Sequence, residues 1–359
     1  MGSMTTEPPK PWIETPLIFS APVSRAAGCN IFLKLENLQP SGSFKSRGIG
    51  NMMLQALSNT SPCSSSHSNQ DDVHFYCSSG GNAGLACATT AATLRRKATI
   101  VVPTSTSEFM VSKLRDFSGV EVIQRGANWF EADRYLRTTF LANQDPTSRG
   151  IYVPPFDHPD IWSGAATLVD EMAQQCDPSI PIDGIVCNVG GGGLLNGVLE
   201  GVEKHGKLLG RGQSPTILAI ETVGADSLNA SVKAGELVTL PGITSIATSL
   251  GATRVAEKTW EWVQHYNQSQ SQSGGLVSGT VTDAEAVMGC VRLLDDARLL
   301  VEVACGATIA TAYNGDLRKY LGKGLTDDEW ASRNVVLIVC GGSNINLSML
   351  GKYKEVYGV

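Results

Sequence analysis

The sequence has few charged residues and no long basic run. Lys and Arg number 28 against 34 Asp and Glu, which gives a net charge of -6 at pH 7, and only 17% of the residues are charged. Nucleic-acid binding needs clustered Lys and Arg that neutralise phosphates, so we expect no nucleic-acid partner. No apolar run approaches the length that spans a membrane, so we expect no membrane partner.

Cysteine is present, but without the spacings that indicate a structural use. The nine cysteines are an odd number, spread widely from Cys29 to Cys340, with no CxxC pair and no zinc spacing. This pattern does not indicate a disulfide framework and is typical of a reducing compartment. The N-terminus also lacks the basic-then-apolar pattern of a signal peptide. We therefore expect a cytoplasmic protein.

Common hydrolase motifs are absent as well. The chain contains neither a G-x-S-x-G elbow nor an H-E-x-x-H sequence, which makes a hydrolase a poor interpretation. The five histidines show no metal-ligand spacing, and we assign them no catalytic role. They are His67, His74, His158, His205 and His265.

Short runs rich in β-branched and aromatic residues alternate with helical patterns along the whole chain. Such alternation predicts an α/β fold with parallel sheets that are covered by helices on both faces. The predicted strands are Ile31 to Leu35, His74 to Cys77, Ala98 to Val102, Val120 to Ile123, Ile185 to Val189, Ile217 to Glu221 and Val335 to Cys340. Polar tracts at Ser58 to Asp72 and Asn267 to Gly275 interrupt the pattern, and we predict surface loops there.

Lys45 occupies a conspicuous position between a predicted strand and a predicted helix. It follows the strand Ile31 to Leu35 and a turn that contains Gly42, and it precedes apolar residues at helical spacing. The spacing therefore places Lys45 on the first turn of a helix. The positive end of the helix dipole disfavours a cation, and a lowered pKa is what a lysine needs to react with a carbonyl compound. On position alone, a solvated lysine at a helix start remains the other interpretation.

Four consecutive glycines, Gly190 to Gly193, lie between a predicted strand and the helical run Leu194 to Val202. Glycines let the backbone approach an anion while N-H groups at the helix start donate, so the segment predicts a phosphate-binding loop. A dinucleotide loop is the alternative, but the third glycine of G-x-G-x-x-G would have to fall at Leu195 or Asn196. A P-loop ending is also missing.

The segment Ser78 to Gly84 lies at a second predicted junction between a strand and a helix, with the helix beginning near Leu85. Backbone N-H groups, the Ser79 hydroxyl and the Asn82 amide suit a carboxylate ligand there. Ser, Gly and Asn are also typical of a plain helix-capping turn, so both interpretations stay open at this point.

Three of these segments, in this order, resemble one known family. Glu36 to Gln39 with Ser43 to Gly48 resembles the pyridoxal-phosphate (PLP) lysine motif of the serine/threonine dehydratase family. Ser78 to Gly84 is similar to its substrate-carboxylate loop, and Gly190 to Leu195 to its cofactor-phosphate loop. The resemblance runs from about Thr15 to the C-terminus and is closest to the cytosolic L-serine dehydratases.

The resemblance implies a fold type II PLP enzyme, similar to the tryptophan synthase β subunit, with two parallel-sheet α/β domains and PLP between them. The large PLP-binding domain would comprise residues 1–46 and 146–359, and the small inserted domain residues 47–145. A homodimer is also implied.

The family's site residues map onto this sequence position by position. Lys45 would be the catalytic lysine that holds PLP and removes the α-proton. The residues implied to bind the cofactor are Phe44, Lys45, Asn82, Gly190, Gly191, Gly192, Gly193, Leu194, Cys305 and Ser343. The residues implied to bind the substrate are Ser43, Ser79, Gly80, Asn82 and Ala83. Judged without the family, Cys305 is equally a small buried hydrophobe.

Glu221 ends a predicted strand and has two interpretations. In a dinucleotide-binding fold it would bind the ribose, whereas the resemblance implies a site for a monovalent cation such as K+. The residues implied for that site are Gly190, Glu221, Ala225, Leu250 and Ala252. Oxygen-only ligands suit such a cation.

Three positions bear on activity and specificity. Related serine racemases carry a proton-transferring serine at the position of Gly80, so glycine favours elimination over racemisation. The nearest serine dehydratases have glutamate at the position of Ser163 and histidine at that of Ala165, which puts serine in doubt as the best substrate.

The resulting hypothesis is a PLP-dependent ammonia-lyase that converts a small β-hydroxy amino acid, L-serine or L-threonine, to a 2-oxo acid and ammonia. Three alternatives remain: a lyase or β-replacement enzyme acting on another β-substituted amino acid in a specialised pathway, a non-catalytic amino-acid sensor, and a dinucleotide-dependent oxidoreductase.

Overall fold

The computed structural model describes residues 9–58, 73–143, 149–210, 212–268 and 274–359. His67 and most of both predicted polar loops lie outside the described residues. The chain divides into two compact units. Unit 1 comprises the described residues of Met1–Ile13, Gln39–Ser41 and Lys45–Gly164, and unit 2 those of Glu14–Leu38, Gly42–Phe44 and Ala165–Val359. Unit 1 thus includes the segment that ends at Ile13 and residues up to Gly164, which the predicted limits at 47 and 145 assign to the large domain.

Unit 1 is built on a four-stranded sheet in which all neighbouring strands are parallel. In spatial order, its strands are β5 (Val120–Gln124), β4 (Lys97–Val102), β3 (Val73–Cys77) and β6 (Arg149–Tyr152). Its core contains fully buried side chains such as Phe75, Ile49 and Met53. Its helices are α2 (Lys45–Ser58), α3 (Asn82–Thr93), α4 (Glu108–Arg115) and α5 (Trp129–Leu136), with a π-helical turn η2 (Arg137–Leu141).

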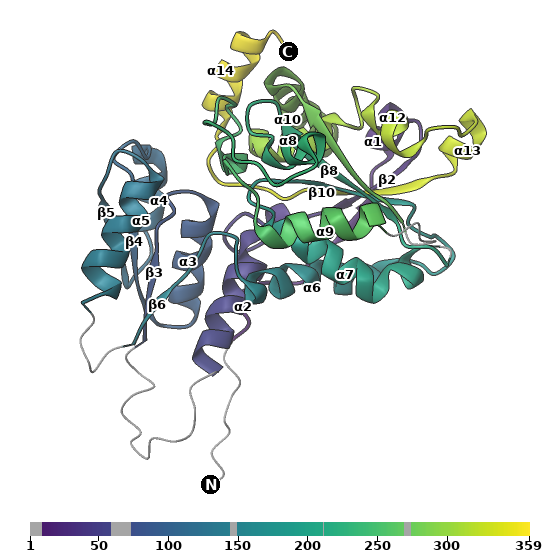
Figure 1. Cartoon of the computed structure of the whole chain (residues 1–359). Helices are drawn as coiled ribbons and strands as arrows, with labels where there is room; N and C mark the ends of the chain where they lie inside the picture. Colours follow the sequence, from purple (N-terminus) through teal and green to yellow (C-terminus); the bar gives the residue numbers. More distant parts are fainter. Residues whose placement is uncertain (1–8, 59–72, 144–148, 211, 269–273) are drawn as a thin grey trace. The chain divides into compact units, whose positions relative to one another are not determined.

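Unit 2 contains a six-stranded sheet that is parallel except for its first strand. In spatial order, its strands are β1 (Leu17–Phe19), β2 (Asn30–Lys34), β10 (Asn334–Ile338), β7 (Gly184–Asn188), β8 (Thr216–Thr222) and β9 (Leu276–Val281). Every residue of β7 and β10 is buried, as is typical of central parallel strands with both faces covered. Figure 1 shows α7 and α9 on one side of these strands and α8 and α10 on the other.

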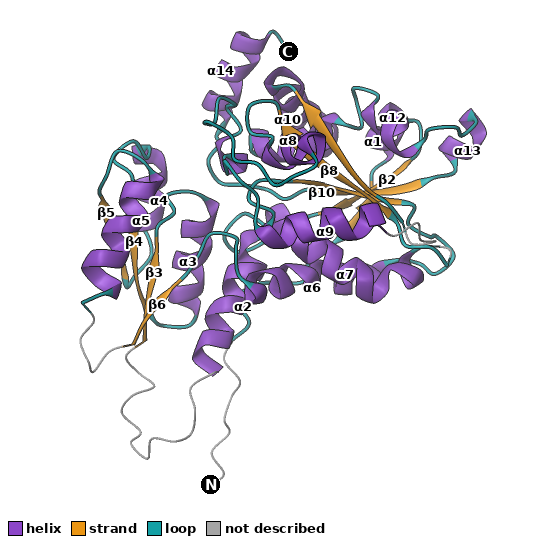
Figure 2. Cartoon of the chain, in the orientation of Figure 1, coloured by secondary structure: helices purple, strands orange, loops and turns teal. Residues whose placement is uncertain are grey.

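The remaining helices surround the larger sheet (Figure 2). They are α1 (Ala21–Ala27), η1 (Glu36–Leu38), α6 (Pro159–Gln175), α7 (Gly193–Leu209), α8 (Ser227–Ala234), η3 (Thr248–Leu250), α9 (Glu257–Gln268), α10 (Asp283–Ala297), α11 (Val303–Ala310), α12 (Asp316–Leu321), α13 (Asp327–Ala331) and α14 (Leu347–Tyr357). Helix α6 crosses from unit 1 to unit 2 at Gly164. Helix α10 begins with a capping box between Thr282 and Glu285, which satisfies amides that a helix start leaves unpaired.

The predicted α/β architecture with parallel sheets is confirmed. All seven predicted strands exist, although β10 ends at Ile338 rather than Cys340. Helix α3 begins at Asn82, three residues before the predicted start, because Gly81 and not a later residue is its N-cap. Strands β1, β6 and β9 were not predicted.

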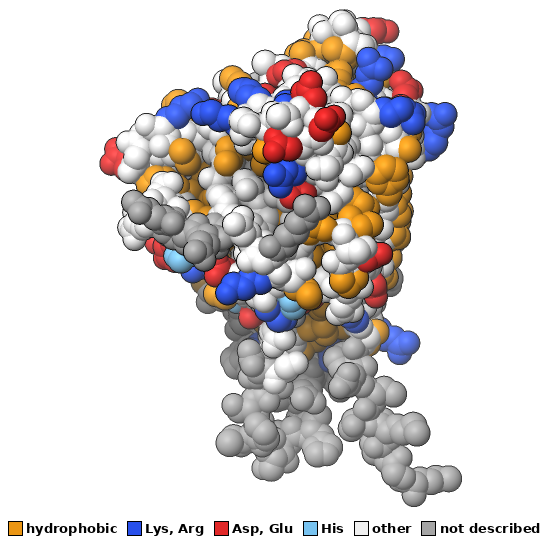
Figure 3. Space-filling model, turned by 90° about the vertical axis from the view of Figure 1, so that its right-hand side faces the viewer, with side chains coloured by type: hydrophobic (Ala, Val, Ile, Leu, Met, Phe, Trp, Pro, Cys, Tyr) orange, Lys and Arg blue, Asp and Glu red, His pale blue; other side chains and the backbone are white. Residues whose placement is uncertain are grey.

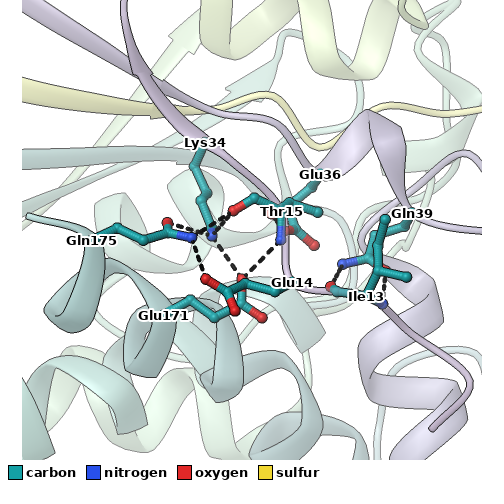
Figure 4. Close-up of polar contacts among 8 residues, drawn as sticks. All are labelled: Ile13, Glu14, Thr15, Lys34, Glu36, Gln39, Glu171 and Gln175. Carbon is teal, nitrogen blue, oxygen red and sulfur yellow. Dashed lines mark hydrogen bonds and ion pairs between the residues drawn. The ribbon is translucent and has the colours of Figure 1, made fainter.

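A buried polar cluster fixes the end of β2, from which the chain leads toward Lys45. Lys34 is fully buried, and its Nζ donates to the Thr15 carbonyl at 2.6 Å, to Glu171 Oε2 at 2.7 Å and to Gln175 Oε1 at 3.0 Å (Figure 4). Thr15 Oγ1 in turn donates to Glu36 Oε1 at 2.5 Å. Because a buried cation must be paired, this cluster defines one arrangement of β2, α6 and the segment around Thr15.

Charges of both signs are interspersed on the face of the molecule shown in Figure 3. Across the described residues, none of the helices combines the length and the apolar character that crossing a membrane requires.

Candidate active site

Lys45 is the first residue of α2, as predicted, and a short turn positions it. Ser46 Oγ donates to Ser41 Oγ at 2.8 Å and accepts the Ser41 amide at 3.1 Å, which closes the turn before the helix. The Lys45 Nζ donates to the Pro155 carbonyl oxygen at 2.6 Å. A lysine amine held in this way keeps a fixed position in unit 1.

The predicted carboxylate loop connects β3 to α3 in the same unit. The N-cap Gly81 provides no side chain to pair the first amides of α3, so the N-H groups of Asn82 and Ala83 are suited to an anionic ligand. Ser79 Oγ accepts the Gly81 amide at 3.3 Å. Gly84 is required here, since a Cβ atom on it would lie 1.9 Å from Ser79 O.

Gly80 faces Thr106, which explains why the position is small. A Cβ atom on Gly80 would lie 2.7 Å from Thr106 Cγ2 and 2.9 Å from its Oγ1. A serine at position 80 would therefore need Thr106 to move. Gly80 itself has no side chain that could carry a proton, and Thr106 occupies the space in which such a side chain would lie.

The positive charge of Lys45 also acts at the end of β3, next to this loop. Cys77 is fully buried, and a side-chain hydrogen bond with Cys87 lowers its pKa. Burial opposes that change, while the positive charge of Lys45 lowers the Cys77 pKa further. The charge of Lys45 therefore acts on the residue that directly precedes Ser78 and Ser79.

In unit 2, Gly190 to Gly193 connects β7 to the 17-residue helix α7. Gly192 adopts φ = 97°, and a Cβ atom on it would lie 1.9 Å from Thr259 Oγ1. The Gly191 carbonyl accepts the Ala256 amide at 3.0 Å, which holds the loop from outside. Gly193 and Leu194 form the first turn of α7, so their amides are among those that the helix leaves unpaired.

This loop fits a phosphate group. The glycines keep side chains out of the space at the helix start, and the positive end of α7 favours an anion. Asn196, on the first turn, is fully buried; its Oδ1 accepts Thr259 Oγ1 at 2.9 Å, and its Nδ2 lacks a partner within the part of the chain that the structure describes. The loop thus offers backbone amides at the positive end of α7, and none of Gly190 to Leu194 carries a charged side chain.

Several predicted cofactor residues of unit 2 gather at the carboxyl ends of β7 and β10. Asn188 Nδ2 donates to Ala304 O at 2.6 Å and to Cys340 Sγ at 3.2 Å, which links both strands to α11. Cys305 is fully buried, and its hydrogen bond with Cys340, together with burial, raises the pKa of Cys340. A hydrogen bond thus connects the thiol of Cys305 on α11 with that of Cys340 after β10.

The backbone of the lysine motif reaches the same place. Ser43 forms an antiparallel bridge with Gly341, and the Phe44 amide donates to Cys340 O at 3.1 Å. Ser343 packs against Gly42, where a Cβ atom would lie 2.5 Å from Ser343 Oγ. Ser43, Phe44 and Ser343 therefore lie around one segment, which Cys340 begins.

In unit 2, sequence reasoning missed one functional candidate. Glu302 is 4% exposed, accepts Ser249 Oγ at 2.5 Å and accepts the Asn344 amide at 2.6 Å. It fixes the backbone beside Ser343, and Gly342 leaves room for its carboxylate. Its partners lie 53 and 42 residues away in the sequence, so only its place before the Cys305 helix could have drawn attention to it.

The residues predicted for a monovalent cation lie in unit 2. Glu221 is fully buried and accepts the amides of Leu228 at 2.9 Å and Asn229 at 2.7 Å, so its carboxylate caps α8. Burial raises the pKa of Glu221 to about 8, although those two hydrogen bonds oppose the change. Gly190 lies close to Leu250, since a Cβ atom on Gly190 would be 3.2 Å from Leu250 Cα.

Three other residues of the predicted cation set take part in backbone hydrogen bonds. The Leu250 carbonyl accepts the Ala252 amide at 2.7 Å, and the Ala225 amide donates to Thr222 O at 2.9 Å. Among the residues in the described ranges, no group of three or more His, Cys, Asp or Glu side chains could hold a metal ion.

The two departures from the family pattern lie next to Gly164 on α6. Ser163 is exposed and accepts Asn51 Nδ2 from α2 at 3.1 Å. Ala165 is 3% exposed. Gly164 between them allows close packing, because a Cβ atom there would lie 2.6 Å from Arg47 O. In unit 1, Ser163 therefore bonds to the helix that Lys45 begins.

Known proteins match nearly the whole chain. The family described as "Pyridoxal-phosphate dependent enzyme" matches residues 10–341. A human protein named "Serine dehydratase-like" is 44% identical over 96% of this chain and 95% of its own length. The "Catabolic L-serine/threonine dehydratase" of Saccharomyces cerevisiae is 39% identical over 89% of this chain and 84% of its own length. The crystal structure of a fungal L-serine ammonia-lyase from Rhizomucor miehei matches this structure with a TM-score of 0.82 and 34% sequence identity. The match covers 97% of this chain and 99% of the Rhizomucor miehei chain.

Proposed function

We propose that this chain, which belongs to the family of pyridoxal-phosphate-dependent enzymes, deaminates L-serine or L-threonine to the 2-oxo acid and ammonia. The observation that carries the proposal is Lys45, which begins α2 with its Nζ fixed on Pro155 O. The dehydratase names of relatives that match most of the chain support the same reaction. A Rhizomucor miehei ammonia-lyase with a similar fold does so too.

The residues present fit the cofactor. Lys45 would bind its carbonyl carbon, and the backbone of Gly190 to Leu194 would bind its phosphate. Asn82, Phe44, Cys305 and Ser343 would contact its ring. When bound, PLP supplies an electron sink for the electrons of the substrate Cα–H bond.

The chain's own residues would bind the substrate and move one proton. The first amides of α3, with Ser79, Gly80, Asn82 and Ala83, would hold the substrate carboxylate, and Ser43 would also contact the substrate. The neutral Lys45 amine would accept the proton from the substrate Cα. A neutral amine still has N-H groups, so it can donate to Pro155 O while its lone pair accepts that proton, which keeps the base oriented.

Elimination is favoured over racemisation at this site. Racemisation needs a second group that returns a proton to the opposite face of Cα, and glycine at position 80 carries no such group. Thr106 fills the space in which a side chain at position 80 would lie. Once the β-hydroxyl group has left, hydrolysis of the C–N bond releases ammonia.

Four further features belong to the proposal. A monovalent cation would bind at Gly190, Glu221, Ala225, Leu250 and Ala252, where the negative carboxylate of Glu221 would receive a counter-charge. Unit 1 would correspond to the small domain and unit 2 to the large one. The sequence resemblance favours a homodimer, and the cysteine usage favours the cytoplasm.

The direct test is product formation. Purified protein with PLP is incubated with L-serine and L-threonine, and both the 2-oxo acid and ammonia are measured. For L-serine or L-threonine, we expect the amount of 2-oxo acid to equal the amount of ammonia. We expect neither product with Lys45→Ala. A cofactor spectrum that changes on adding L-serine, without any product, would instead indicate a sensor or another substrate.

A further inference from the structure

Unit 1 contains a cavity of about 450 Å³ that the reaction of serine does not require. Its walls include the aromatic side chains of Trp129, Tyr152 and Phe156, together with Met52 and two consecutive prolines. The volume falls within the range of pockets that enclose small ligands. A hydroxymethyl or hydroxyethyl side chain would occupy only a small part of it.

The cavity adjoins the catalytic amine. Pro155 forms part of its wall, and the carbonyl of the same residue accepts Lys45 Nζ at 2.6 Å. A substrate whose Cα lies at Lys45 therefore has this cavity within reach of its side chain. Pro154 and Pro155 restrict the backbone of that wall, because proline fixes φ.

Three ionisable side chains line the cavity, Arg137, Asp157 and His158, and the carboxylate of Asp157 disfavours an anionic occupant. Arg137 lies in the wall, but its Nε donates to Asp133 Oδ2 at 2.8 Å, and its guanidinium group stacks 3.9 Å from the Tyr152 ring centroid. Asp133 also accepts Ser78 Oγ and Tyr152 Oη, each at 2.7 Å. Burial opposes ionisation of Asp133, but these hydrogen bonds outweigh it and lower the pKa. The positive charge of Arg137 is thus offset by Asp133 behind the wall, so the side chains around the cavity favour a neutral occupant.

The same hydrogen bonds connect the cavity to the carboxylate loop. Ser78 directly precedes Ser79, and Asp133 ties Ser78 to Tyr152 in the cavity wall. The wall and the loop that would hold the substrate carboxylate therefore form one bonded assembly in unit 1. Fixing the carboxylate at one end fixes the direction of the substrate side chain relative to the cavity.

We propose that this cavity receives the β-substituent of the substrate, and that the substrates include β-hydroxy amino acids with a neutral aromatic β-substituent, such as 3-phenylserine. The inference rests on the proposed function, since it needs the substrate Cα at Lys45. In the reaction, the Cα–H and Cβ–O bonds break and water leaves. Hydrolysis of the C–N bond consumes one water, so the net products are phenylpyruvate and ammonia.

The test compares kcat/KM for L-threo-3-phenylserine, L-threonine, L-serine and L-threo-3-hydroxyaspartate, and titrates the cofactor absorbance with each. We expect kcat/KM for phenylserine to equal or exceed that for L-threonine. Trp129→Ala should lower the ratio of phenylserine to serine activity at least tenfold. Phe130→Ala is the matched control, because Phe130 is the next residue of α5, 67% exposed and outside the cavity wall. It should change that ratio less than twofold, and circular dichroism would verify that both variants fold.

The outcomes separate this inference from the proposed function. Turnover of serine or threonine with no reaction and no spectral change on adding phenylserine would overturn the inference alone. A preference for hydroxyaspartate over phenylserine would also overturn it, because it would show an anionic occupant. Turnover of phenylserine alone would support the inference and refute the serine and threonine assignment. No spectral response to any of the four compounds would refute both.

Discussion

Replacement of Gly192 by alanine tests the phosphate loop. The residue has φ = 97°, and a conformation of this kind costs a non-glycine residue about 1–3 kcal/mol. The new Cβ atom would also lie 1.9 Å from Thr259 Oγ1, and forcing an extra carbon into a packed site costs a further ~1–3 kcal/mol. We therefore expect Gly192→Ala to destabilise unit 2 by about 2–6 kcal/mol and to weaken PLP binding at least tenfold.

The assay is urea unfolding of the holoenzyme, combined with titration of the apoenzyme by PLP. Gly235→Ala is the matched control: Gly235 has φ = 74° at the end of α8, with nothing within 4 Å of an added Cβ. The free energy of unfolding of Gly235→Ala should fall by only about 1 kcal/mol, which is the cost of the left-handed conformation to alanine. This variant should bind PLP as the wild type does. Wild-type PLP affinity in Gly192→Ala, with no greater loss of stability than in Gly235→Ala, would refute the reasoning.

Two further predictions concern buried charges. Lys34→Met leaves the Glu171 carboxylate without its cation and should destabilise the protein by about 3–5 kcal/mol in urea unfolding. The double variant Lys34→Met with Glu171→Met should recover most of that loss. Equal losses of stability in the single and double variants would contradict the pairing. Glu221 has a folded pKa of about 8, above its ordinary 4.5, so its stabilising contribution is complete below pH 4.5 and is lost as the pH rises through 8. Without K+, Glu221 should lower the free energy of unfolding by about 1.4 kcal/mol per pH unit between pH 6 and 8. Both Glu221→Gln and added K+ should flatten this slope. An unchanged slope in Glu221→Gln would contradict the assignment.

Much of the fold could be predicted because parallel strands read as short apolar runs. β7 and β10 are buried on both faces, and their sequences show it. β1 has only three residues, β6 only four, and β9 is half-exposed at the sheet edge and contains Gly279. These strands owe their existence to pairing with neighbours, which leaves a weak local pattern.

The candidate site was predictable where glycine, serine and lysine occur in short motifs. Lys45 and the glycine loop are each defined by a few consecutive residues. Lys45 begins a helix, and Gly192 has the positive φ that the loop before α7 requires. Asp133 and Glu302 could not be found in this way. Each is a single acidic residue whose partners come from distant segments, such as Ser78 and Ser249, and only the folded chain brings them together.

The most direct test of PLP chemistry at Lys45 is the absorbance spectrum of the purified protein before and after borohydride, with Lys45→Ala as the control. We predict a long-wavelength band of lysine-bound PLP that borohydride removes in the wild type and that is absent from the variant. We also predict that L-serine or L-threonine changes this band. A wild-type protein that binds no PLP, or a Lys45→Ala variant with the same reducible band, would contradict the assignment of Lys45.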